Sequence, residues 1–160
     1  MFDKLLPQPI DNTYSGAKLA LWLFGLIVFV HILQSIMGIV NGYSIAQSAD
    51  GIPLETYPAA AAQTIMALFM TASLRRLIIS LICAVVLFRY RSVVPLMFVV
   101  LGLSYLGGQL IFQFVPIVRV GTPPGVIMNL IMFGFTIVGL GLSLWRRGGS
   151  HLIGRRTRAT

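Results

Sequence analysis

Four long stretches of apolar residues account for most of the chain, at about 17–40, 59–88, 93–115 and 125–145. Each stretch reaches the ~20 residues that a helix needs to cross a ~30 Å hydrocarbon core. Helices are expected because lipid offers no hydrogen bonds, so a spanning segment must pair its own backbone groups. The pattern predicts an all-α integral membrane protein, built as a four-transmembrane-helix bundle.

Start and stop signals flank these stretches. Pro58 suits the first turn of the second helix, and Arg89 ends it. The second stretch is about 46 Å long as a helix, more than the hydrocarbon core, so it is expected to tilt or to project from the membrane. The polar segment 42–57 is expected to be a loop, and the turn-rich residues 121–125 are expected to start the fourth helix.

Composition supports a membrane protein, since 57% of the residues are hydrophobic and only 10% are charged. One transmembrane domain is expected over residues 1–147, followed by a basic cytoplasmic tail over 148–160. The net charge of +8 comes from residues that flank the apolar stretches, so it indicates orientation and no nucleic-acid partner.

The distribution of Lys and Arg predicts the orientation. Nine of them lie before the first helix, between the second and third, or after the fourth, whereas Arg119 alone lies on the other side. Since cytoplasmic segments carry the excess of positive charge, both termini are predicted to be cytoplasmic (N-in/C-in). The expected location is the bacterial inner (plasma) membrane, crossed several times.

Arg75 and Arg76 interrupt the second apolar stretch. An arginine at the bilayer centre disfavours insertion by about 2.5–3.5 kcal/mol, and the apolar residues of this helix offset two of them only narrowly. One interpretation is that both side chains reach outward to the head groups. The other is that one or both face the bundle interior or a partner, where the counter-ion is an anionic lipid, an anionic small molecule or a carboxylate of another protein.

Other polar residues within the apolar stretches lie at a similar height, about 20–27 Å from the predicted cytoplasmic ends of their helices. They repeat at helical spacing, so each set is expected to face inward. One interpretation is hydrogen bonding between helices, assisted by close packing at glycines of the last two helices. These glycines are Gly102, Gly107, Gly108, Gly134, Gly139 and Gly141.

The other interpretation is a polar ligand-binding cavity open to the outside. The candidate residues for this cavity are Arg75, Arg76, His31, Gln34, Tyr105, Gln109 and Asn129.

The sequence lacks the residues that several kinds of chemistry would require. Cys83 is the only cysteine, which excludes an intramolecular disulfide and a dithiol redox pair. All four acids lie outside the apolar stretches, so a carboxylate reaches the arginines only if the first loop, with Asp50 and Glu55, folds inward. His31 is the only histidine in an apolar stretch and is expected to be a packed hydrogen-bonding side chain. No catalytic residue, metal site or cofactor is predicted.

Two main functional hypotheses remain. The first is a noncatalytic accessory or self-associating module, which functions as a homo-oligomer or within a larger membrane complex. The second is a binder or carrier of an anionic or amphipathic small molecule or lipid. A membrane-embedded enzyme acting on lipid is a third hypothesis, for which the sequence lacks an acid–base pair.

Overall fold

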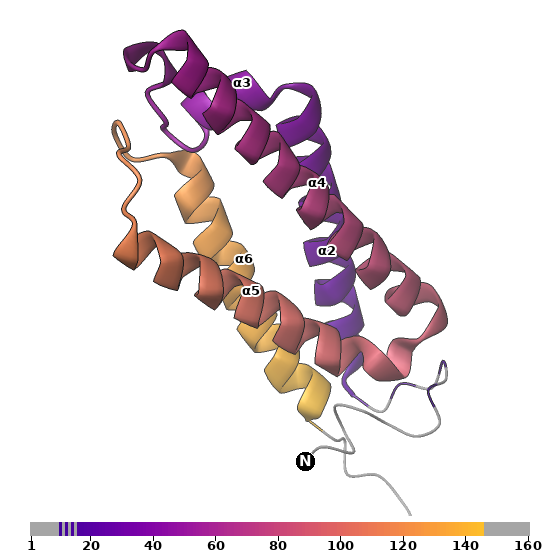
Figure 1. The fold of residues 1–160 in the computed structure, drawn as a ribbon. Coiled ribbons are helices and arrows are strands. Elements are labelled where there is room, and N and C mark those ends of the chain that lie inside the picture. The colour runs from indigo at the N-terminus through magenta and orange to yellow at the C-terminus, as the bar shows by residue number, and fades with distance from the viewer. Residues whose placement is uncertain (1–9, 11, 13, 15, 146–160) are drawn as a thin grey trace, which may run out of the picture.

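The computed structural model describes residues 10, 12, 14 and 16–145 and is all-helical over this part of the chain. Four of its helices are long and apolar enough to cross a membrane. This confirms the prediction of a multi-pass helical membrane protein. The long helices, shown in Figure 1, are α2 (Lys18–Val40), α4 (Ala59–Arg89), α5 (Val94–Phe114) and α6 (Pro124–Leu144).

Three short helices connect them: α3 (Gly42–Ser48) and two 3-10 turns, η1 (Leu54–Thr56) and η2 (Arg91–Val93). The predicted loop over 42–57 thus contains two short helical segments, α3 and η1. The helical chain bends at Asn41, where φ is −125° and ψ is 40°, and continues as α3. Seven residues are too few to show a helical hydrophobic pattern against a polar background.

Helix α2 packs against α4 and α6, and α6 also packs against α5. Small residues allow α2 and α3 to approach α4 closely. A Cβ added at Gly38 would collide with Ser73 Oγ, and one added at Gly42 would lie 3.0 Å from Cε of Met66. Such spacing of small residues is a common means of packing helices in lipid.

The core lies at one end of the bundle, where α2 starts, α6 ends and η2 joins α4 to α5 (Figure 1). We call this the closed end. Phe24 and Phe98 meet there edge to face, with ring centroids 5.1 Å apart. The fully buried or nearly buried core side chains include Ala20, Phe24, Ile27, Cys83, Val94 and Phe98.

Hydrogen bonds join the start of α2 to the end of α6 at the closed end. The Tyr14 hydroxyl donates to Ser143 Oγ over 3.0 Å, and the Ala17 N–H donates to the Leu142 carbonyl over 3.2 Å. Burial raises the pKa of Tyr14 above its usual value, while the bond to Ser143 acts in the opposite direction. Tyr14 and Ala17, which precede α2, thus belong to the packed closed end.

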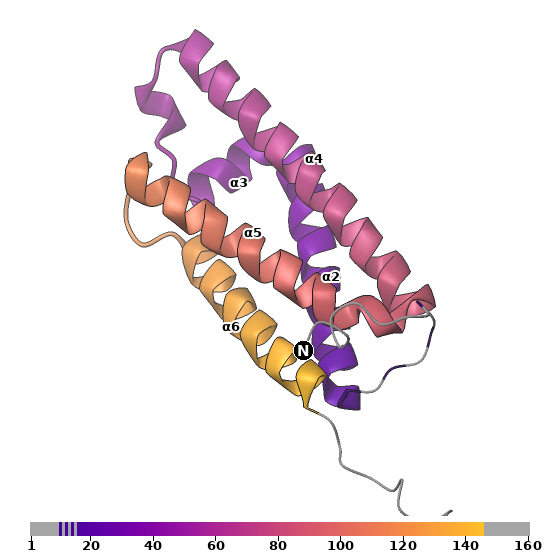
Figure 2. The ribbon, with the colours of Figure 1, turned by 60° about the horizontal axis from the view of Figure 1, so that its bottom comes forward.

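The opposite end is open. From η2, α4 and α5 diverge along their lengths, as both views show (Figures 1 and 2). Helix α3 and the residues after it lie at this end, between the α2–α4 pair and the start of α6 (Figure 2). We call it the open end.

The glycines of α5 and α6 differ in their surroundings. Gly139 is buried against the Phe98 ring, and Gly102 lies beside Thr136, as close packing requires. The expectation of close packing was wrong within this chain for the other four, since a Cβ at any of them would meet nothing within 4 Å. Those four are Gly107, Gly108, Gly134 and Gly141.

We expect Gly139→Ala to lower the free energy of unfolding by about 1–3 kcal/mol, because the added Cβ would collide with the buried Phe98 ring. Gly141→Ala, in the same helix but beside open space, is the matched control and should be neutral or stabilise by up to ~1 kcal/mol. Thermal unfolding in detergent measures both. Equal melting temperatures for the two variants would contradict the proposed packing of α5 on α6.

Candidate functional site

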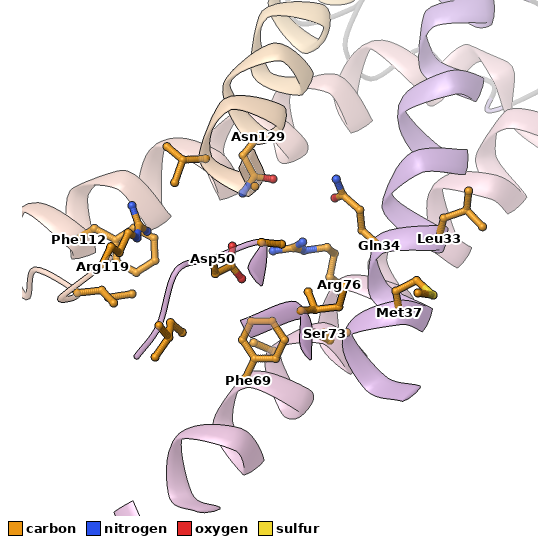
Figure 3. Close-up of a pocket in the computed structure, with 18 of the residues that line it drawn as sticks. Leu33, Gln34, Met37, Asp50, Phe69, Ser73, Arg76, Phe112, Arg119 and Asn129 are labelled. Carbon is orange, nitrogen blue, oxygen red and sulfur yellow. The ribbon is translucent and has the colours of Figure 1, made fainter. Parts of the chain in front are cut away.

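A pocket of about 460 Å³ opens between the helices at the open end (Figure 3). All four long helices, α3 and the two segments that follow α3 and α5 contribute to its wall. Its apolar lining includes Leu33, Met37, Ile45, Phe69, Phe112, Ile117 and Val126. Its polar and charged lining consists of Gln34, Asp50, Ser73, Arg76, Gln109, Arg119 and Asn129.

Two arginines and one carboxylate form the charged part of the pocket. Arg76 comes from the middle of α4, Arg119 from the segment between α5 and α6, and Asp50 from the residues after α3 (Figure 3). The Arg119 guanidinium lies 5.3 Å from the centroid of the Phe112 ring, a cation–π contact. With Asp50 ionised, the pocket keeps a surplus of positive charge.

The Asp50 side chain is half-buried. Partial burial raises the pKa of its carboxyl above the usual value, and attraction to Arg76 and Arg119 partly offsets that rise. Among the described residues, neither arginine forms an ion pair with it within 4.0 Å. The carboxylate is therefore attracted electrostatically to both arginines but forms a direct ion pair with neither.

The amide side chains in the pocket form no hydrogen bonds with the residues that the structure describes. Oε1 of Gln34 is buried without a partner among them. The side chains of Gln109, which is exposed, and Asn129, which is half-buried, also make no hydrogen bond to another described residue. The donors and acceptors of Gln109 and Asn129 are therefore available to a polar ligand or to water.

Backbone hydrogen bonds cross the open end beside the pocket. The Val120 N–H donates to the Gly51 carbonyl and the Gly125 N–H to the Ala49 carbonyl, each over 2.9 Å. We call the pairing of residues 49–51 with Val120 and Gly125 the clasp. Gly51 has φ of 69°, a backbone conformation that favours glycine. A Cβ at this position would also lie 2.7 Å from Cγ of Pro123, so glycine is required for both conformation and space.

The structure brings together four of the residues proposed from the sequence: Arg76, Gln34, Gln109 and Asn129 all line the pocket. The other three do not line it. Arg75 is exposed on another face of α4, His31 is half-buried, and the Tyr105 ring stacks on Phe133 with centroids 4.3 Å apart.

Two charged pocket residues outside the helices, Asp50 and Arg119, were not among the candidates predicted from the sequence. Both lie between helices, at the end to which the polar residues of α2, α4 and α6 also belong. The adjacent Asp50–Gly51 pair signals a turn, but only the clasp determines that this turn folds inward.

We expect Gly125→Ala to open the clasp, since its Cβ would lie 2.6 Å from the Ala49 carbonyl oxygen and 2.9 Å from Oδ1 of Asp50. Amide hydrogen exchange at Val120 and at residue 125 should become faster by about tenfold or more, which corresponds to a loss of about 1.4 kcal/mol of protection. Gly134→Ala, in the same helix beside open space, should leave both amides unchanged. Unchanged protection in Gly125→Ala would contradict the clasp.

No family model matches the chain, and neither the curated proteins nor the solved structures contain a significant match. The geometry of the pocket is therefore the basis for the function proposed below.

Proposed function

We propose that the protein binds an amphipathic molecule with an anionic group in the pocket at the open end. The observation that supports this most strongly is a set of polar side chains without protein partners facing a cavity with apolar walls. The pocket volume of about 460 Å³ falls within the roughly 300–1,000 Å³ that is typical of small-molecule sites.

Charge favours an anion. Arg76 and Arg119 outnumber Asp50, and guanidinium groups bind carboxylate and phosphate oxygens through two parallel N–H donors. The amide groups of Gln109 and Asn129 add donors and acceptors beside them. A phosphate or carboxylate between the two arginines would satisfy groups that the protein leaves unpaired.

The apolar walls favour a ligand with a hydrocarbon part. Phe69, Phe112 and Leu33 lie in the same pocket as the charged groups. Phe69 belongs to α4 and Phe112 to α5, so a hydrocarbon tail that packs on both rings would lie in the part of the pocket between these helices. Burial of each CH₂ contributes about 0.8 kcal/mol, so a short tail would add substantially to the affinity.

We also propose that the closed end faces the cytoplasm and that the open end faces outward from the plasma membrane. The excess of Lys and Arg supports this orientation, since nine of them lie in the sequence at or before the start of α2, at the junction of α4 with α5, or after α6, whereas only Arg119 lies in the connections at the open end. The tail over 148–160 lies outside the described residues, and its cytoplasmic location is part of this proposal.

A second candidate is self-association or docking in a larger membrane complex. It is favoured by Gly134 and Gly141, which lie seven residues apart on one face of α6 and have no neighbour that an added Cβ would touch. Ile137 and Val138 nearby are about half exposed. Such a face permits a close approach by another helix.

Adjacent arginines provide a test of ligand binding. Arg76→Gln should weaken binding of dodecyl phosphate by about 10- to 100-fold, since a hydrogen bond to a charged group contributes about 1.5–3 kcal/mol. Arg75→Gln, which removes the same charge outside the pocket, should bind like the wild type. Native mass spectrometry in a nonionic detergent measures both, and inorganic phosphate serves as the ligand without a tail.

Equal weakening by the two substitutions would indicate a general effect of charge and contradict the pocket. Binding of inorganic phosphate as tight as that of dodecyl phosphate would contradict the role of the apolar walls.

Orientation can be tested with single cysteines, because buried Cys83 is the only native one. In a Cys83→Ala background, a cysteine at exposed Thr56 should react with a membrane-impermeant maleimide on intact cells. A cysteine at exposed Tyr90 should react only after the membrane is permeabilised. The reverse labelling pattern would show that the closed end faces outward.

A further inference from the structure

Asp50 is the pocket residue that binding of a simple anion leaves unexplained. A carboxylate beside two arginines repels a phosphate and weakens the positive potential that would attract it. An anion site would be stronger without this side chain. Its presence suggests that the ligand also carries a positive charge.

The structure restricts the position of this carboxylate. The Ala49 carbonyl accepts the Gly125 N–H, and Asp50 Oδ1 lies 2.9 Å from the point that a Cβ of Gly125 would occupy. Asp50 is thus packed against the first turn of α6 and faces the pocket (Figure 3). Within the described residues its side chain makes neither a hydrogen bond nor an ion pair, so both oxygens remain available as acceptors.

The chemistry of the cation follows from the acceptors that Asp50 offers. A primary ammonium group has three N–H donors and therefore suits the two oxygens of a carboxylate. A quaternary ammonium has no N–H donor and cannot satisfy these oxygens in this way.

We propose that the pocket selects a phospholipid whose headgroup combines a phosphate with a primary ammonium group, such as phosphatidylethanolamine. Arg76 and Arg119 bind the phosphate, and Asp50 accepts the hydrogen bonds of the ammonium group. This inference rests on the proposed function, because it assigns the ligand of the same pocket. Opposite charges in the headgroup match the opposite charges of the three side chains.

A membrane lipid fits better than a soluble zwitterion. Apolar side chains make up a large part of the wall, including Phe69 and Phe112 on the two helices that diverge. The clasp joins the segment after α3 to the segment before α6 and the first turn of α6, and the apolar wall includes residues of both α4 and α5. A lipid can therefore place its headgroup at the charged side chains while its chains lie against the apolar wall.

The experiment measures lipid preference by native mass spectrometry of the full-length protein in a nonionic detergent. The probes are phosphatidylethanolamine, phosphatidylcholine and phosphatidylglycerol with the same acyl chains. The wild type should bind phosphatidylethanolamine about tenfold or more tightly than the other two. Asp50→Asn should lose this preference and bind phosphatidylglycerol as well as or better than the wild type.

Two further variants control for folding and position. Glu55→Gln removes a carboxylate that is hydrogen-bonded to Gln47 and lies outside the pocket, so it should keep the wild-type preference. Asp50→Glu retains the charge and should keep more of the preference than Asp50→Asn. Melting temperatures within a few degrees of the wild type establish that each variant is folded.

The outcomes separate this inference from the proposed function. Wild-type preference for phosphatidylglycerol, or equal loss of all three lipids in folded Asp50→Asn, would overturn the role of Asp50 while leaving an anion-binding pocket intact. Binding of every lipid that is insensitive to Arg76→Gln would overturn the proposed function and this inference together. Lipid selectivity that depends on Asp50 alone among the acids would support both.

Discussion

The contact of Phe98 with Gly139 and Phe24 determines where the helices of this protein come together. Glycine at 139 lets α6 approach the Phe98 ring, which Phe24 of α2 meets from another side. The packed core is concentrated around these rings, at the closed end. Because α4 and α5 are joined there by the short turn η2, their divergence leaves space at the opposite end, where the pocket lies.

Polar residues occupy the part of the bundle that the core leaves open. Gln34, Arg76 and Asn129 belong to three different helices, and all three line the same cavity. The clasp then adds Asp50 and Arg119 from the connecting segments. Close packing at one end and a polar cavity at the other are therefore two consequences of one helix arrangement.

Sequence periodicity was sufficient for the helices and for part of the site. Four apolar stretches of spanning length predicted the four long helices, because lipid leaves few alternatives to a helix. Spacing along single helices also identified Gln34, Gln109 and Asn129, which line the pocket. Both kinds of inference depend on contacts within one helix, which sequence spacing describes well.

Interactions between segments far apart in the sequence could not be predicted from the spacing of residues along one helix. Nothing in the local sequence of Asp50 shows that its neighbours Ala49 and Gly51 bond to residues 125 and 120. The packing of glycines failed for a related reason, since Gly134 and Gly139 look alike in the sequence but only the second meets an aromatic ring. Which face of a helix meets a neighbour depends on the arrangement of the whole bundle.

The helix arrangement places the two adjacent arginines of α4 in different surroundings, which lowers the free-energy penalty of having both in a membrane helix. Successive helical residues point about 100° apart, so Arg75 and Arg76 lie on different faces of α4. Both side chains are exposed, but only Arg76 lines the pocket, whereas the long side chain of Arg75 can reach toward the head groups. Arg76 faces a polar cavity and attracts Asp50, which reduces the penalty of about 2.5–3.5 kcal/mol for an arginine in lipid. Helix α4 is thus compatible with a membrane because the pocket accommodates one of its two charges.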